Sequence, residues 1–299
     1  MELKIGFFAD GPWSHKAFKK IVQDNNLLIK FICVRFDTKD KTLKNYSEEY
    51  NIDYLKHENI NSKDFIDNVR KYNCDLFVSM SFNQIFKNEI INLPKLKIIN
   101  CHAGKLPFYR GRNVLNWVLI NDEKEFGITV HFIDQGIDTG DIILQETYQI
   151  TDKDNYSSLL KLAHVECAKI LYKAINLINS SQKFSKIKQD TIHPIGFYCP
   201  QRTFGDEVLD WKKTSREIFN FIRAISKPGP MALSYIHGKE IKINDSKIYS
   251  NAPNYKCTEG YVVGIDKKGV CVKTSDNFLL ITEYEYDGKL KVGDKLERK

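Results

Sequence analysis

The chain has 299 residues, of which 42% are hydrophobic and 28% charged, and its formal net charge is +7. This composition is ordinary for a globular protein, and the length suggests two domains. No apolar run approaches the length of a membrane span, so we expect no membrane insertion.

The cysteines and the N-terminus bear on the cellular compartment. Seven cysteines are dispersed without a C-x-x-C pair, which suits free thiols in a reducing compartment. The first residues read as a strand, and Asp10 follows before any signal-peptide hydrophobic region develops. We therefore expect a cytoplasmic protein. The lysines are spread along the whole chain, which favours a solvated basic surface and argues against a nucleic-acid partner.

Short apolar strands alternate with helical patterns in the first part of the chain. We expect strands over residues 2–8, 27–34, 75–80, 96–100 and 127–133, and helices over residues 15–22, 63–72, 113–121 and 155–178. This alternation predicts an α/β fold with a mostly parallel sheet and helices on both faces.

The pattern changes after residue 181. Residues 182–210 are irregular, and Thr214 and Glu217 have capping-box spacing at the start of a helix. Alternating stretches near residues 240–243, 260–263 and 278–281 then indicate short strands. We expect residues 1–203 to form a catalytic domain and residues 204–299 a smaller, mostly β domain with one helix.

Several familiar site motifs are missing from the sequence. No G-x-G-x-x-G follows the first strand, and no P-loop, H-E-x-x-H, zinc-spaced Cys/His set or G-x-S-x-G occurs. Dinucleotide binding and P-loop phosphoryl transfer are therefore poorly supported, and we expect no metal.

Asn100, His102 and Asp138 are polar residues that lie at a predicted strand end or in a predicted turn. Asn100 and His102 lie at the end of a predicted strand, where ligands of open α/β sheets bind. Asp138 lies between Gly136 and Gly140, in a turn that could bring it to the imidazole. Each residue alone is explained by a turn or packing role, but the three together predict a site.

The three side chains match what acyl transfer to an amine requires. The Asn100 amide can donate a hydrogen bond to an oxyanion, and the His102 imidazole can take the amine proton. The Asp138 carboxylate can orient the imidazole and stabilise its charged form. Neither a metal nor a covalent acyl-enzyme is needed.

The motifs around these residues resemble those of the 10-formyltetrahydrofolate-dependent formyltransferases. The resemblance rests on Asn100-x-His102, on residues 106–111 and on residues 127–140. Residues 110–117 and 202–211 are similar to the sugar N-formyltransferases, including the formyltransferase domain that acts on an amino-arabinose nucleotide. Both that domain and the methionyl-tRNA formyltransferases have an Ala-Pro pair after the arginine-glycine region, where this chain has Arg112-Asn113-Val114. This departure leaves the identity of the sugar open.

The resemblance implies a Rossmann-like formyltransferase fold with Asn100, His102 and Asp138 as catalytic residues. It also implies a site for N10-formyltetrahydrofolate, formed by Met80, Ser81, Phe82, Asp134 and Gly136.

Further residues are candidates for binding an acceptor, although loop anchoring, packing or ion pairing explains many of them equally well. Guanidinium groups match phosphate geometry, and an aromatic side chain in a loop can reach a ligand. The candidates are Trp13, Lys105, Tyr109, Arg110, Arg112, Arg202 and Arg223. We expect His131, which alternates with apolar residues on a strand, to be structural.

The preferred hypothesis is a sugar N-formyltransferase that acts on a nucleotide-linked amino sugar, with dTDP-4-amino-4,6-dideoxy-hexose as the best guess. Such an enzyme would serve surface polysaccharide synthesis, such as lipopolysaccharide O-antigen, and relatives of this type are often homodimers. The alternatives are a methionyl-tRNA formyltransferase and a formyltetrahydrofolate hydrolase. The first predicts strongly basic tRNA-binding segments, whereas residues 204–299 mix lysines with many acids.

Overall fold

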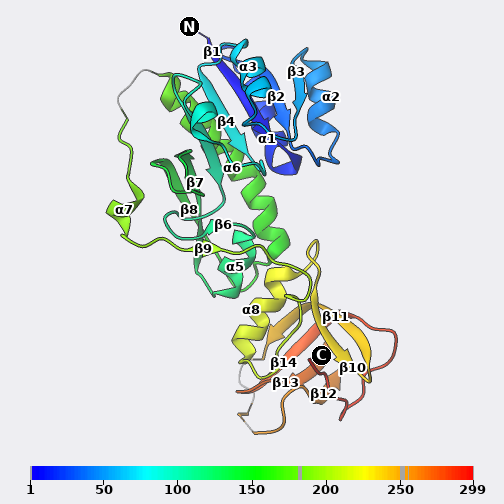
Figure 1. The fold of residues 1–299 in the computed structure, drawn as a ribbon. Helices are drawn as coiled ribbons and strands as arrows, with labels where there is room; N and C mark the ends of the chain where they lie inside the picture. Colours follow the sequence, from blue (N-terminus) through cyan, green and yellow to red (C-terminus); the bar gives the residue numbers. More distant parts are fainter. Residues whose placement is uncertain (1, 181–183, 250–252, 255, 299) are drawn as a thin grey trace. The chain divides into compact units, whose positions relative to one another are not determined.

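The computed structural model describes residues 2–180, 184–249, 253–254 and 256–298. The chain forms two compact units (Figure 1). The first comprises Met1–Gly111, Phe126–Tyr148 and Lys161–Cys199, and the second comprises Arg112–Glu125, Gln149–Leu160 and Pro200–Lys299. Residues 112–125 and 149–160, which precede the boundary predicted near residue 204, thus belong to the second unit.

A seven-stranded sheet forms the centre of the first unit. Its strands follow the order β3 (Asp53–Lys56), β2 (Leu27–Val34), β1 (Leu3–Ala9), β4 (Leu76–Met80), β5 (Ile98–His102), β7 (Glu125–Phe132) and β8 (Ile142–Gln149). The strands from β3 to β5 pair in parallel, whereas β7 runs antiparallel to β5. The predicted mostly parallel α/β sheet is confirmed.

Helices cover both faces of this sheet, as two adjacent phenylalanines of β1 show. The Phe7 ring lies 6.3 Å from Phe18 of α1 (Gly11–Val22), and the Phe8 ring lies 6.3 Å from Phe65 of α3 (Lys63–Arg70). Because successive side chains of a strand point to opposite faces, α1 and α3 cover opposite faces of the sheet. Residues of α4 (Asn88–Ile91) join the core on the Phe8 face.

Several elements of the first unit were not predicted from the sequence. The longest of them are α2 (Thr42–Glu49), the edge strand β3 and strand β8. Helix α2 buries only Leu43 and Ser47, so its sequence shows too weak an apolar stripe to indicate a helix.

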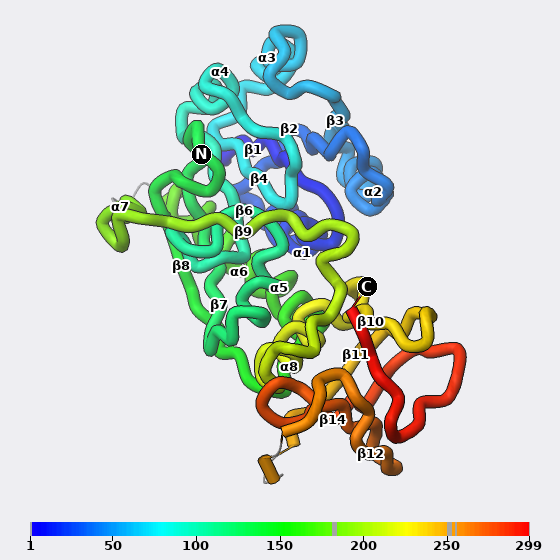
Figure 2. The backbone as a smooth tube through the Cα atoms, turned by 60° about the horizontal axis from the view of Figure 1, so that its bottom comes forward, coloured from blue at the N-terminus to red at the C-terminus, as the bar shows by residue number. Residues whose placement is uncertain are grey.

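A segment near the C-terminal end of the first unit passes beside the loop that follows β5. It runs from α7 (Gln189–Ile192) to β9 (Tyr198–Cys199), and β9 pairs in parallel with β6 (Arg110–Gly111) (Figure 2). The long helix α6 (Tyr156–Asn179), whose residues from Lys161 onward belong to this unit, confirms the helix expected over residues 155–178.

The second unit combines two helices with an antiparallel sheet. The helices are α5 (Val114–Ile120) and α8 (Ser215–Ile225), and the sheet has the order β10 (Ala232–Ile236), β11 (Lys239–Ile248), β14 (Phe278–Glu285), β13 (Gly269–Lys273) and β12 (Val262–Asp266). The predicted capping box is present, since Thr214 accepts from the Glu217 amide and Glu217 accepts from the Thr214 amide. The expected mostly β character of this region is confirmed.

Candidate active site

Strand β5 brings Asn100 and His102 to one edge of the sheet. Asn100 pairs in register with Ser79 of β4 on one side and with His131 of β7 on the other. Because residues two apart on a strand share a face, the side chains of Asn100 and His102 point the same way. Neither residue is fully buried.

Asp138 reaches the same place from the loop between β7 and β8. Its φ of 54° lies in the left-handed region, which aspartate tolerates better than most residues. The loop is fixed from within, because Asp134 Oδ1 accepts from the Gly136 amide at 3.0 Å and from Thr139 Oγ1 at 2.5 Å. A Cβ at Gly140 would lie 1.9 Å from the Phe132 carbonyl oxygen, so only glycine fits where the loop closes on β7.

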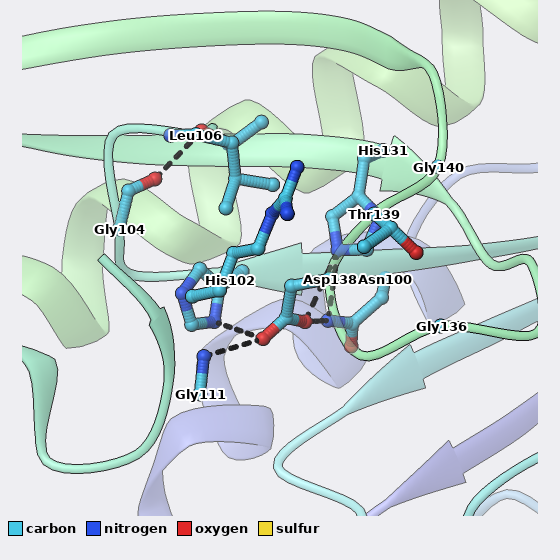
Figure 3. A network of polar contacts seen from close by, with 12 residues as sticks. Asn100, His102, Gly104, Leu106, Gly111, His131, Gly136, Asp138, Thr139 and Gly140 are labelled. Atoms are coloured by element: carbon cyan, nitrogen blue, oxygen red, sulfur yellow. Dashed lines mark hydrogen bonds and ion pairs between the residues drawn. The ribbon is translucent and has the colours of Figure 1, made fainter. Parts of the chain in front are cut away.

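The side chains of Asn100 and His102 both face the Asp138 carboxylate, so the three predicted residues lie together (Figure 3). Oδ2 lies 3.6 Å from His102 Nδ1, and Oδ1 lies 3.5 Å from Asn100 Nδ2. The Gly111 backbone amide donates to Oδ2 at 2.9 Å. The side chains of His102 and Asp138 are 10% and 13% exposed, so the pair is largely shielded from water.

The surroundings of Asp138 keep it ionised. Burial alone would raise the pKa of this carboxyl group, but the facing His102 and His131 rings and the Gly111 amide hold the pKa well below its usual range. A carboxylate held in this way supports a positive charge on the neighbouring imidazole.

The other nitrogen of the His102 ring is occupied by the backbone. Nε2 lies 2.7 Å from the Tyr109 carbonyl oxygen, which only accepts, so Nε2 carries a proton. Gly104 allows this approach, because a Cβ there would lie 2.5 Å from His102 Nε2 and 2.4 Å from the Tyr109 oxygen. Nδ1, which faces Asp138, is therefore the nitrogen that can exchange a proton.

His131 is part of this site, although its alternation with apolar residues indicated a structural role. The ring is 2% exposed, and Nε2 lies 3.4 Å from Asp138 Oδ1 and 3.3 Å from Asn100 Nδ2. Nδ1 lies 2.8 Å from the Phe132 carbonyl oxygen. The pairing of Asn100 with His131 in the sheet register brings the ring here, and the sequence alone does not reveal that register.

The residues predicted for folate lie in two segments that border the three catalytic candidates. Met80 ends β4 and is buried, Ser81 follows it with a φ of 57°, and the half-buried Phe82 packs on Phe8. The other segment holds Asp134 and Gly136, whose mutual contact shapes the Asp138 loop.

The candidate acceptor residues of the first unit have intramolecular contacts. The Trp13 ring packs edge-on against His164, with centroids 4.6 Å apart. Lys105 is half-buried in the loop after β5, and the Tyr109 ring packs against Phe197 while its carbonyl faces His102. The Arg110 guanidinium donates to Gln189 Oε1, a contact that the sequence did not indicate.

The other three candidates belong to the second unit. Arg112 donates to Gln201 at 2.7 Å, and the Arg202 guanidinium lies over the Trp117 ring at 5.6 Å. Arg223 is 4% exposed and donates to the Thr151 carbonyl at 2.7 Å and to Asn220 at 3.0 Å. Arg223 is thus engaged inside this unit.

Comparison with known proteins identifies the family. The formyl transferase model matches residues 15–175, and the model of the formyl transferase C-terminal domain matches residues 203–294. The chain belongs to the formyl transferase family. The motifs around Asn100, His102 and Asp138 predicted a formyltransferase, and this enzyme class is confirmed.

The proteins that this formyltransferase resembles include enzymes named for different acceptors. A methionyl-tRNA formyltransferase of Fusobacterium nucleatum is 33% identical over 98% of this chain and all of that protein. The bifunctional polymyxin resistance protein ArnA of Wigglesworthia glossinidia brevipalpis is 34% identical over 81% of this chain and 36% of its own length. The structure of WlaRD, a sugar 3N-formyl transferase in the presence of dTDP and 5-N-formyl-THF, matches 97% of this formyltransferase and 100% of its own chain with a TM-score of 0.68 and 25% identity.

Two further observations concern the described part of the formyltransferase. No group of three or more His, Cys, Asp or Glu side chains there could hold a metal ion. None of its helices combines the length and the hydrophobicity that a membrane span requires.

Proposed function

We propose that this formyltransferase moves a formyl group from N10-formyltetrahydrofolate to the amine of a nucleotide-linked amino sugar. The convergence of Asn100, His102 and Asp138 at the end of β5 carries the proposal. Together they offer a hydrogen-bond donor, a proton acceptor and a supporting carboxylate within one largely buried group.

Each of these residues has a defined part in the transfer. The Asn100 amide has two N–H groups, which in this structure lie near Asp138 Oδ1 at 3.5 Å and His131 Nε2 at 3.3 Å. Both contacts are long, so one N–H can turn to donate to the oxygen that becomes negative as the amine adds. His102 Nδ1 takes the amine proton and returns it to the departing nitrogen. The resulting imidazolium is held on both sides, by the Tyr109 carbonyl at Nε2 and by Asp138 at Nδ1.

The residues bordering the site fit a folate. The folate supplies the formyl group in the reaction. The half-buried Phe82 and Ile137, which is 51% exposed beside Asp138, offer apolar surface that a flat heterocycle can cover. The backbone of residues 134–138 adds polar groups at the same place, and polar groups of this kind orient a ligand.

The charges of the second unit favour a nucleotide sugar as the acceptor. Residues 204–299 contain 17 Lys and Arg residues against 14 Asp and Glu residues. Several of the basic side chains are paired within the unit, as in the contacts of Lys213 with Glu217, Lys227 with Glu285 and Arg216 with Asp152. A surface that grips the tRNA phosphate backbone needs unpaired positive charge.

Methionyl-tRNA formyltransferase is the second candidate. The full-length match to the Fusobacterium nucleatum enzyme favours it. The match to WlaRD over its whole chain favours a sugar, and the dTDP in that structure makes a dTDP-linked amino sugar our first choice. A formyltetrahydrofolate hydrolase, which passes the formyl group to water, would need no acceptor.

The biological setting follows from the proposed substrate. We propose a homodimer in the cytoplasm that supplies a formamido sugar for surface polysaccharide, such as the O-antigen of lipopolysaccharide. Our first choice of acceptor is a dTDP-4-amino-4,6-dideoxy-hexose.

The decisive assay offers the enzyme several acceptors in parallel. Purified protein is incubated with N10-formyltetrahydrofolate and dTDP- or UDP-linked 3-amino and 4-amino sugars, or with methionyl-tRNA, and the products are weighed by mass spectrometry. We expect a gain of one formyl group on a nucleotide sugar. Formylation of methionyl-tRNA alone would establish the second candidate, and folate turnover without any acceptor would establish the hydrolase.

A further inference from the structure

Gln189, at the start of α7, is a buried amide that the proposed chemistry does not use. The residue is 4% exposed, and Nε2 donates to the backbone carbonyls of Asp138 and Gly140, each at 2.8 Å. Oε1 accepts from Arg110 Nε at 3.1 Å and from Arg110 Nη2 at 2.6 Å. Both N–H groups and both lone pairs of the amide are therefore satisfied.

Together with the Gly111 contact described above, these hydrogen bonds form a closed network, called here the Gln189 ring, that links Gln189, Arg110, Gly111 and Asp138. Gln189 holds the backbone of the Asp138 loop on one side and the Arg110 side chain on the other. The next residue after Arg110 is Gly111, whose amide donates to Asp138 Oδ2 at 2.9 Å. The ring thus fixes the distance between β6 and the Asp138 loop, and the Gly111 contact depends on that distance.

The strand pairing of β6 makes this ring rigid. Arg110 and Gly111 pair with Tyr198 and Cys199 of β9, so β6 cannot shift alone. The Asp138 loop has no such neighbour in the sheet order, and the two bonds from Gln189 hold it to the β6 side.

We propose that Gln189 is a positioning residue for formyl transfer, which holds the backbone of the Asp138 loop so that the carboxylate faces His102. This inference rests on the role proposed above for Asp138. It also gives Arg110, predicted to bind the acceptor, a part in holding Gln189.

Glutamine suits this place better than its close analogues. A glutamate would still pair with Arg110, but its oxygens would face two carbonyl oxygens where Gln189 now donates. An asparagine is one methylene shorter and cannot span the same gap. Gln189→Glu therefore breaks the bonds to the loop and keeps the pair with Arg110.

The test compares Gln189→Glu with the wild-type protein by kinetics. We expect kcat to fall by about 10- to 100-fold, with the KM of folate and acceptor changed less than about twofold, because a small displacement of a reacting group costs this much.

Hydrogen exchange measures the same loop without any substrate. Peptides covering residues 110–112 and 137–141 are expected to exchange faster in Gln189→Glu than in the wild type, at a temperature where both are folded. Because this measurement uses the protein alone, it tests the positioning role even where no acceptor in the panel is formylated.

Asn116→Asp is the matched control, since it places a carboxylate on another buried amide that donates to a carbonyl, that of Ala224. It should lower the melting temperature while the folded protein keeps its kcat and its exchange over residues 137–141. Unchanged exchange in Gln189→Glu, or faster exchange with wild-type kcat, would overturn the positioning role. Gln189→Met, which removes the polar atoms, should give the same result as Gln189→Glu.

Discussion

At the residue scale, one carboxylate has several tasks in this formyltransferase. Asp138 faces His102, His131 and Asn100 and accepts from the Gly111 amide. The contacts with the two rings and with the Gly111 amide favour its ionised form, which is why its pKa is low despite burial. The same contacts also limit how far the side chain can move, so the charge and its position are set together.

Asn100→Ala tests the proposed oxyanion donor. We expect kcat to fall by about 10²- to 10³-fold, because one hydrogen bond to the developing charge is lost. The KM for folate should change only a few-fold, since the donor acts mainly in the transition state. Asn92→Ala, which alters an exposed asparagine after α4, is the control. A change confined to KM would assign Asn100 to substrate binding instead.

Gly104→Ala tests the contact between His102 and the Tyr109 carbonyl. The added Cβ would lie within 2.5 Å of both partners, so they must separate. We expect at least a tenfold loss of kcat, as is typical when a reacting group is displaced. Gly264→Ala is the control, because its Cβ would make ordinary contacts at 3.7 Å. Full activity in Gly104→Ala would show that the Tyr109 contact is dispensable.

Sequence alone indicated Asn100, His102 and Asp138 because each combines a reactive side chain with a strand end or a turn. It did not indicate Gln189, and it suggested a structural role for His131. His131 depends on the strand register opposite Asn100, and Gln189 depends on a segment that returns from about fifty residues away to Asp138. Contacts of this kind leave no local pattern in the chain.

At the element scale, the start of α8 is tied to the loop after α5 by ion pairs within the second unit. Arg216 contacts Asp122 and Asp152, and the hydrogen bond from Arg216 lowers the pKa of Asp122 well below its usual value. A carboxyl group with a lowered folded-state pKa stabilises the fold above its unfolded pKa, which is about 3.9. This stabilisation is lost as the pH falls through the folded-state pKa.

Asp122→Asn should therefore destabilise the protein in a pH-dependent way. At pH 7 we expect a loss of about 1 kcal/mol in the free energy of unfolding, a modest value because Asp122 is partly exposed. The difference from the wild type should shrink as the pH falls below about 4. Urea unfolding at several pH values measures it, with Asp67→Asn, which removes an exposed pair with Arg70, as the control. A difference that does not change with pH would mean that the charge of Asp122 is unimportant.

The periodic elements were the most predictable parts of the fold. The strands of the sheet centre and helix α6 have strong apolar patterns, and the box at Thr214 and Glu217 marks the start of α8. The edge strand β3 and helix α2 bury few side chains, so packing by their neighbours determines them more than their own sequence does.

At the scale of the whole molecule, a net charge of +7 does not by itself tell whether the acceptor is a tRNA or a nucleotide sugar. The salt dependence of acceptor binding does. A chain that binds tRNA through phosphate contacts loses affinity steeply as salt rises, by about 10³-fold or more between 50 and 200 mM for six or more contacts. A nucleotide sugar carries few charges and responds weakly.

We therefore expect the KM of the acceptor to change no more than about fivefold over that salt range. Steady-state kinetics with the acceptor found in the panel measure this, and methionyl-tRNA binding is followed in parallel. Tight tRNA binding at 50 mM salt that collapses at 200 mM would favour the methionyl-tRNA candidate.

The most direct test of the account is the single-turnover rate of formyl transfer in His102→Ala, measured with the acceptor that the panel identifies. Our account predicts a rate at least about 100-fold below that of the wild type, with folate affinity and melting temperature nearly unchanged, because a positioned general base contributes this much. A rate within a few-fold of the wild type would show that transfer does not depend on the imidazole beside Asp138.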